Sequence, residues 1–126
     1  MKQRELITRN APAPLGPYSQ AVGANGFIFV SGQIGIDPIT GAMPDDIASQ
    51  THQAIKNVAA ILESAGTSLN KVVRADVFVT DMNNFAAVNK IYAEYFSNDP
   101  KPARQVCGAA ALPKNARLEI SCIALT

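Results

Sequence analysis

The sequence predicts an α+β protein in which two helices cover one face of a single mixed β-sheet. Apolar side chains occupy every second position in the runs 72–80 and 117–125, as in half-buried strands. A helical apolar stripe runs through residues 46–65 and a shorter one through residues 81–96. Because the predicted elements follow the order β-β-β-α-β-α-β-β, one sheet with both helices on the same face is the economical arrangement. The length of 126 residues fits one domain, residues 1–126.

The N-terminal part is predicted to consist of short strands and a structured loop. Residues 5–8 form a strand candidate, and the three prolines within residues 10–18 exclude a helix and favour extended chain. Residues 19–24 and 27–33 flank an Asn-Gly dipeptide, which favours the positive φ angles of a two-residue turn. We therefore expect a β-hairpin at this place.

A first helix is predicted over residues 46–65. Asp45 and Asp46 stand at its start, where the helix dipole favours acidic side chains. Gly66 follows its end and can adopt the left-handed conformation that terminates many helices. The residues expected to face the core repeat at intervals of three and four: Ile47, Thr51, Ala54, Val58, Ile61 and Ala65.

Two of the later strands alternate between an apolar face and a mixed face. In the strand predicted over residues 72–80, the apolar face is Val73, Ala75, Val77 and Val79, and the mixed face is Arg74, Asp76 and Phe78. In the strand predicted over residues 117–125, Leu118, Ile120, Cys122 and Ala124 are opposite Arg117, Glu119, Ser121, Ile123 and Leu125. Because the mixed face is too apolar for water and too charged for a core, we expect other subunits to cover it in a homo-oligomer.

Between these strands, the sequence predicts a helix capped by Asp81 and ending near residue 96. A strand over residues 103–110 and a turn over residues 112–116 should follow it. One stripe of this helix carries three aromatic residues and one amide: Phe85, Asn89, Tyr92 and Phe96. Since a packed amide needs hydrogen-bond partners, Asn89 is expected to bond the backbone of a neighbouring loop or to contact a ligand.

The composition argues against several classes of protein. The formal net charge is +1 and no run of Lys or Arg occurs, so the electrostatic footprint of a nucleic-acid or anionic-membrane binder is missing. No window approaches the roughly 20 apolar residues of a membrane-spanning helix, and no apolar leader segment occurs at the N-terminus. We therefore expect a protein of the cytoplasm that binds no membrane, and any binding of nucleic acid would have to be local.

The sequence offers no ligand set for a metal or a cofactor. Cys107 and Cys122 form no CxxC motif and have no histidine neighbour, so both are expected to be reduced thiols. Neither a His, Cys or carboxylate cluster nor a Gly-rich phosphate loop occurs. His52 falls outside the predicted core stripe and is expected on a solvated helix face. No metal and no cofactor are predicted.

Arg104 is the first candidate site residue. Small apolar neighbours leave space beside its side chain, and a guanidinium keeps its charge inside a protein. It either holds a carboxylate or phosphate through two parallel hydrogen bonds, or forms an ion pair with Glu119 or Asp76 at a subunit contact. The local pattern leaves both alternatives open.

Glu119 is the second candidate, because apolar residues flank it on the last strand. If it is partly desolvated, it can position a water or act as a general base; alternatively, it pairs with Arg74 or Arg117. Further hydroxyls and a backbone amide stand at predicted strand ends, where sites in sheet proteins often lie. They belong to Tyr18, Ser31 and Gly32.

Several segments together resemble the reactive-intermediate deaminase family RidA, also called YjgF: GPYSQAV at 16–22, FVSGQIGIDPITGAMP at 29–44, VFVTDMNNFAAVNKIYAEYF at 77–96, PAR at 102–104 and LPKNARLEISCIA at 112–124. The resemblance implies a chorismate-mutase-like α+β fold, a homotrimer with clefts at the subunit interfaces, and no cofactor. It also implies hydrolysis of 2-iminobutanoate, 2-iminopropanoate and their enamine tautomers to 2-oxo acids and ammonia. Such intermediates are released by pyridoxal-phosphate-dependent dehydratases, which implies a functional link to those enzymes.

By position, the resemblance implies a role for each candidate. Arg104 matches the arginine that clamps the substrate carboxylate, and Glu119 matches the glutamate that helps to place the attacking water. Residues that match the pocket lining are Tyr18, Ser31, Gly32 and Asn89. The subgroup best matched to this activity has a cysteine two residues after the arginine, where this chain has Val106, which we expect to line the substrate site. Alternation turns Cys107 away from Arg104 unless a bulge intervenes, so Val106 lowers the expected efficiency of deamination.

Three functions are compatible with these residues. The first is an imine/enamine deaminase with Arg104 as the carboxylate clamp. The second is a non-catalytic module that binds small carboxylates in the same cleft, and Val106 is the residue that keeps it open. The third is an endoribonuclease activity that inhibits translation, described for some members of the family. The near-neutral charge and the lack of a catalytic histidine pair argue against the third.

Overall fold

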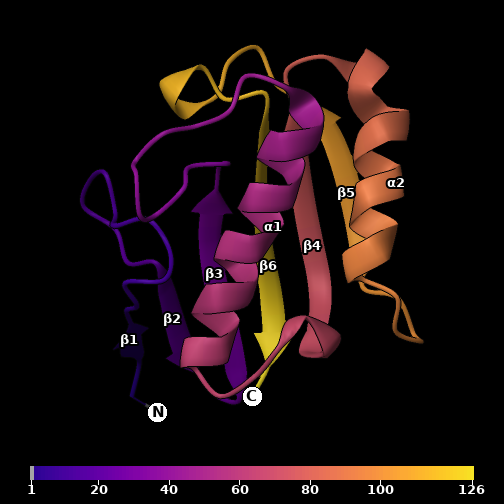
Figure 1. Cartoon of the computed structure of the whole chain (residues 1–126). Coiled ribbons are helices and arrows are strands. Elements are labelled where there is room, and N and C mark those ends of the chain that lie inside the picture. Colours follow the sequence, from indigo (N-terminus) through magenta and orange to yellow (C-terminus); the bar gives the residue numbers. More distant parts are fainter. Residues whose placement is uncertain (1) are drawn as a thin grey trace.

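A computed structural model describes residues 2–126 as a six-stranded mixed sheet with both α-helices on one face (Figure 1). The elements are β1 (Arg4–Leu6), β2 (Ala21–Ala24), β3 (Phe27–Gln33), α1 (Ile47–Ser64), β4 (Val72–Val79), α2 (Phe85–Tyr95), β5 (Ala103–Gly108) and β6 (Leu118–Leu125). Across the sheet the strands are ordered β1-β2-β3-β6-β4-β5. The parallel pair β4–β5 requires a crossover, which α2 supplies. The predicted fold class and order of elements are confirmed.

The predicted hairpin is confirmed as β2–β3, with Asn25 and Gly26 at φ angles of 54° and 82° in its turn. The first strand was expected over residues 5–8, but β1 is already complete at Leu6. The Gln20 side chain explains this difference, because its amide accepts from the Thr8 N–H at 2.8 Å and donates to the Thr8 carbonyl at 3.0 Å. The backbone of Thr8 therefore bonds a side chain and not a neighbouring strand, and β2 begins only after Gln20.

Both ends of α1 follow the prediction. The Asp46 carboxylate accepts a hydrogen bond from the Ser49 N–H at 2.9 Å, and this bond lowers the pKa of Asp46. After the helix, Gly66 has a φ of 81°, and the Thr67 N–H donates to the Leu62 carbonyl at 3.0 Å. These two features form the glycine-dependent Schellman ending that the sequence predicted.

The hydrophobic core lies between the sheet and the two helices. Thr51, Ala54, Val58 and Ile61 of the predicted α1 stripe are buried, whereas Ile47 and Ala65 at its ends are only partly buried. In β4, however, Val72 faces the core and Val73 is 40% exposed, which corrects the predicted apolar face. The pairing of β4 with β6 shifts by one residue between Val72 and Arg74, so Val73 is the extra residue of a bulge.

The second half of the chain contains two predicted features that the structure describes as 3₁₀ turns, and one of them corrects the start of a helix. Asp81 caps a 3₁₀ turn over Met82–Asn84, because its carboxylate accepts from the Asn83 N–H at 2.9 Å, and the α-helix proper begins only at Phe85. The turn expected over residues 112–116 is confirmed as another 3₁₀ turn, over Pro113–Asn115. Both 3₁₀ turns close within three residues, a geometry that the helical and turn patterns of the sequence did not separate.

No helix formed by residues 2–126 covers the opposite face of the sheet (Figure 1). Large apolar side chains are exposed there or lie at its edge, namely Phe27, Phe29, Val73 and Leu125. We call this side the open face. Among residues 2–126, no helix has the length and the apolar character that crossing a bilayer requires.

Candidate active site

The side chain of Arg104 projects from β5 on the side of the sheet that the helices cover. In the β4–β5 register it stands beside Ala75, which is fully buried beneath the helices. Its Nη1 donates a hydrogen bond of 2.7 Å to Oδ1 of Asn89 on α2. The guanidinium carbon also lies 4.7 Å from the centroid of the Tyr92 ring and 5.9 Å from that of the Phe85 ring. The partner of Asn89 is therefore this arginine, and not the backbone of a loop.

No carboxylate within residues 2–126 pairs with the Arg104 guanidinium. One of the two partners that the sequence suggested, Asp76, is occupied by Arg74, with a distance of 3.0 Å between Nη2 and Oδ1. Arg104 is thus held by a neutral amide and by ring faces, which stabilise a cation without cancelling its charge. Most of its hydrogen-bond donors are free to meet an anion.

Val106 and Cys107 lie on opposite sides of β5. The β4–β5 register runs from Ala103 to Gly108 without a shift, so no bulge changes the alternation. Val106 therefore shares the side of Arg104, where it packs against the main core, and Cys107 stands beside Phe78 on the open face. The thiol is on the wrong side of the strand to assist Arg104 of the same chain.

Glu119 lies on the open face, opposite Phe78 in the β4–β6 register. It is partly buried, and this desolvation raises the pKa of its carboxyl group. The pairing with Arg74 or Arg117 that the sequence suggested is not found. Arg74 binds Asp76, and Nε of Arg117 donates instead to the Asp45 carbonyl at 2.6 Å. The result is a partly desolvated carboxylate that has no cationic partner among residues 2–126.

Gly32 brings the end of β3 against Glu119. A Cβ atom on Gly32 would lie only 2.7 Å from Cδ of Glu119 and 2.8 Å from its Oε1. The β3–β6 register shifts between Val30 and Gln33, so Gly32 belongs to a β-bulge, a feature that often re-aims side chains beside active sites. This close approach is possible because position 32 has no side chain.

Ser31 connects the same bulge to the proline-rich loop. Its hydroxyl donates to the Ser19 carbonyl at 2.6 Å, and its N–H donates to the Gln20 carbonyl at 2.9 Å. Tyr18, next to Ser19, is 45% exposed, and its hydroxyl accepts from the Leu15 N–H at 3.1 Å. The hydrogen bonds of Ser31 thereby hold the proline-rich loop, with Tyr18, beside the end of β3, where Gly32 approaches Glu119.

The candidate residues therefore form two groups. We call Arg104, Asn89 and Val106 the edge half-site, and we call Tyr18, Ser31, Gly32 and Glu119 the open-face half-site. Arg104 and Glu119 belong to opposite faces of the sheet, since Arg104 aligns with buried Ala75 and Glu119 with Phe78. A single chain does not bring the two half-sites together.

We call Asn89 and the rings of Phe85 and Tyr92 the seat of Arg104. The sequence did not reveal this functional feature. The sequence places Phe85, Asn89 and Tyr92 on one helical stripe and suggests a loop backbone or a ligand as the partner of Asn89. The signal that could have revealed more was the polar residue inside an aromatic stripe. It could not identify Arg104 as the partner, because the placement of β5 beside α2 is a long-range result of the fold.

Two further predictions concern the histidine and metals. His52 is not fully solvated on its helix, since it is half-buried and its Nδ1 lies 2.8 Å from the Tyr95 hydroxyl on α2. The packing of α1 against α2 explains this correction. Within residues 2–126, no group of three or more His, Cys, Asp or Glu side chains is arranged to hold a metal ion.

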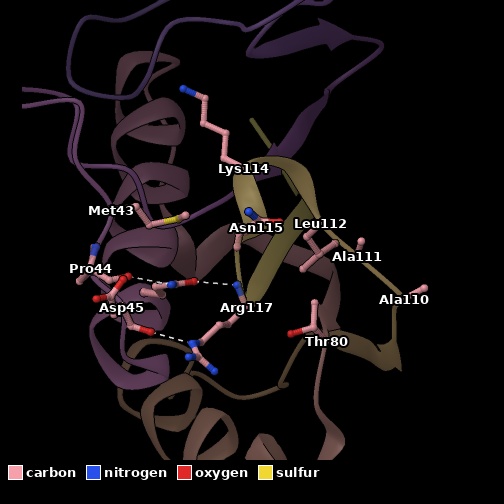
Figure 2. Close-up of a pocket in the computed structure, with 12 residues that line it drawn as sticks. Met43, Pro44, Asp45, Thr80, Ala110, Ala111, Leu112, Lys114, Asn115 and Arg117 are labelled. Carbon is pink, nitrogen blue, oxygen red and sulfur yellow. Dashed lines mark hydrogen bonds between the residues drawn. The ribbon is translucent and has the colours of Figure 1, made fainter.

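A cavity of about 390 Å³ lies where α1 begins and the segment after β5 passes over the sheet (Figure 2). Gln50, which is buried, donates to the Pro44 carbonyl at 2.7 Å and accepts from the Arg117 N–H at 2.8 Å. Figure 2 shows Arg117 reaching Asp45, while Lys114 points away from it. None of the candidate residues lines this cavity, and its polar groups serve to tie the loop to α1.

The fold and the candidate residues define a small α+β protein with one mixed sheet, a two-helix layer and an arginine without a counter-ion at the sheet edge. The chain belongs to the RidA (YjgF-like) family. A sequence profile described as Endoribonuclease L-PSP matches residues 8–126. The membership predicted from the sequence motifs is thus confirmed.

Three relatives of known sequence or structure are similar to this chain over nearly their whole length. A RutC family protein of Pyrococcus horikoshii is 51% identical over 120 residues, which cover 94% of each chain. The 2-iminobutanoate/2-iminopropanoate deaminase of Salmonella typhimurium is 43% identical over 124 residues, or 97% of each chain. The crystal structure of Escherichia coli TdcF with bound serine is 38% identical, covers 98% of each chain and has a TM-score of 0.93.

Proposed function

We propose that this protein is an imine/enamine deaminase that hydrolyses 2-imino acids such as 2-iminobutanoate and 2-iminopropanoate to 2-oxo acids and ammonia. The observation that carries the proposal is the Arg104 guanidinium, which is held by Asn89 and two aromatic rings without a carboxylate partner. Such a cation is suited to bind the carboxylate of a small substrate through two parallel hydrogen bonds. The name of the Salmonella typhimurium relative supports the same reaction.

Orientation can supply most of the catalysis, because an imine carbon is already electrophilic. In the proposed reaction, Arg104 holds the substrate carboxylate and Glu119 accepts a proton from the attacking water. The water oxygen adds to the imine carbon, and Glu119 returns the proton to the nitrogen, which gives a carbinolamine. The remaining hydroxyl proton then passes through Glu119 to the nitrogen as the C–N bond breaks, which releases ammonia and leaves a carbonyl. The raised pKa of Glu119 suits a group that must both accept and return a proton.

The two half-sites act together only if they come from different copies of the chain. The sheet separates Arg104 from Glu119 within one copy, so a substrate held by Arg104 must meet the Glu119 of a neighbour. Phe27, Phe29, Val73 and Leu125 on or beside the open face provide apolar area for such a contact. The homotrimer implied by the family resemblance would supply this contact. A particle mass of 13.3 kDa in solution, which is the mass of a single chain, would contradict this arrangement.

A coupled assay tests the proposed activity. A threonine dehydratase supplies the 2-imino acid, and the protein should speed the appearance of 2-oxobutanoate. Arg104→Ala should lower kcat/KM by about 10- to 100-fold, since a hydrogen bond to a charged group contributes about 1.5–3 kcal/mol. Arg9→Ala is the matched control, because Arg9 is also an exposed arginine but belongs to neither half-site. Equal activity of the Arg104 variant and the control would refute the proposal.

A second candidate function is a non-catalytic module that binds small carboxylates. Val106 favours it, because this apolar residue stands on the side of Arg104 where the resemblance calls for a thiol. Titration calorimetry with 2-oxobutanoate, combined with the coupled assay, separates the two functions. Binding that is lost in Arg104→Ala, without acceleration of imine hydrolysis, would select the binding module.

An endoribonuclease function, named in the matching profile, has less support from the site. The sequence contains one histidine, His52, which bonds Tyr95 between the two helices and belongs to neither half-site. RNA cleavage that persists in a highly purified preparation and is lost in Glu119→Ala would favour this function over the deaminase.

A further inference from the structure

The Tyr92 ring is the most deeply buried part of the seat on which Arg104 rests. Tyr92 is 7% exposed, and its ring stacks on Phe96 with a centroid distance of 4.3 Å and an interplanar angle of 22°. The Arg104 guanidinium lies over the Tyr92 ring at 4.7 Å, closer than to the more exposed Phe85 at 5.9 Å. The ring is therefore a fixed surface, because it is buried and stacked on Phe96.

Because the seat of Arg104 is uncharged, it leaves the hydrogen-bond donors of the guanidinium free for a ligand. An Asp or Glu beside Arg104 would occupy the donor fork and compete with an incoming carboxylate. The seat observed here uses a single donor, the Nη1–H that meets Asn89, and otherwise offers ring faces. The remaining N–H groups of the guanidinium stay available.

We infer that Tyr92 is a positioning residue for Arg104. Its ring sets the plane and reach of the guanidinium, so that the free donor edge points outward before a carboxylate arrives. An arginine side chain loses rotamer entropy when it is fixed, and the seat removes part of this loss before the ligand binds. The inference rests on the proposed carboxylate-binding role of Arg104, because Tyr92 acts only through that residue.

The structure also indicates which variants separate the Tyr92 ring from its hydroxyl group. The Tyr92 hydroxyl is the buried side-chain polar atom that has no hydrogen-bond partner among residues 2–126, so Tyr92→Phe keeps the ring and breaks no hydrogen bond. Tyr92→Leu and Tyr92→Met fill the core but remove the ring. Ile91→Ala is the matched control, because it weakens the packing of α2 at a buried position outside the Arg104 seat.

Binding of 2-oxobutanoate and steady-state kinetics give the first readout. Tyr92→Leu and Tyr92→Met should raise Kd and KM about two- to fivefold with a smaller change in kcat, as expected for a cation–π contact of about 0.5–1 kcal/mol. Tyr92→Phe should bind like the wild type. Ile91→Ala should lower the melting temperature but leave Kd unchanged, which separates positioning from general destabilisation.

An NMR measurement tests the geometry without relying on activity. The Arg104 side-chain N–H resonance, assigned with Arg104→Lys, should show an upfield ring-current shift that Tyr92→Phe retains and Tyr92→Leu loses. An unshifted resonance in the wild type, or unchanged Kd values in both ringless variants, overturns the role of Tyr92. If Arg104→Ala binds 2-oxobutanoate as well as the wild type does, the proposed function is refuted. The ring-current shift then tests separately whether Arg104 stacks on Tyr92.

Discussion

Replacing Gly32 with alanine should impair catalysis far more than folding. The new Cβ would lie 2.7 Å from Cδ of Glu119, roughly 1 Å inside the ordinary contact distance between carbon atoms of about 3.5–4.0 Å. Because the atoms it meets belong to the end of a flexible side chain, the carboxylate can turn away. The expected loss of unfolding free energy is therefore at the low end of the overpacking range, about 1 kcal/mol. A displacement of about 1 Å at a reacting group costs about 100-fold in rate, so kcat should fall by that order.

The coupled dehydratase assay and urea unfolding measure the two effects. Gly108→Ala is the matched control, because a Cβ there would approach Met82 no closer than 3.5 Å and should be tolerated. In a Glu119→Ala background, Gly32→Ala should have almost no further effect, since the group it displaces is absent. A Gly32→Ala enzyme with normal kcat, or equal losses with and without the Glu119 carboxylate, would refute this reasoning.

Three other predictions follow from burial and close approach. Burial raises the pKa of Glu119 above 4.5, so the contribution of this group to stability is present at acid pH and is lost as the pH rises through the folded-state pKa. In urea unfolding, Glu119→Gln should therefore be more stable than the wild type at neutral pH but not at acid pH. Burial raises the pKa of the Cys122 thiol to about 12, so in a Cys107→Ser background iodoacetamide should react only upon unfolding, and rapid labelling of the folded protein would contradict this. A Cβ on Gly35 would lie 2.7 Å from the backbone Cα of Gln50, so Gly35→Ala should lower the unfolding free energy by about 1–3 kcal/mol, measured by thermal and chemical denaturation.

Local signals in the chain predicted much of the fold. The Asn25-Gly26 turn and the two ends of α1 were identified correctly, because each depends on the conformational preference of one or two residues. The predicted apolar face of β4 was wrong by one residue at the start of the strand, where Val72 and Val73 are adjacent and chemically equivalent. The pairing with β6 decides that Val72 faces inward and Val73 outward, and no local pattern encodes this register.

The site was predictable to a different degree. The motifs identified Arg104 and Glu119 as candidates, and strand alternation predicted correctly that Cys107 turns away from Arg104. The contact between Gly32 and Glu119 was not predictable, because it joins a bulge in β3 to the neighbouring β6. The same holds for the Tyr92 ring beneath Arg104, which requires a helix and a strand separated in sequence to pack together.

By itself, the sequence determined the order of strands and helices, the family, and the residue types available for chemistry. Only the tertiary structure decided that Arg104 and Glu119 lie on opposite faces of one sheet and that the arginine has a neutral aromatic seat. It also decided that Glu119 pairs with no cation in the described part of the chain, residues 2–126. The physical reason is the range of the forces involved. Alternation, capping and turn preferences act over a few residues, whereas burial, charge pairing and strand register depend on which distant segments become neighbours.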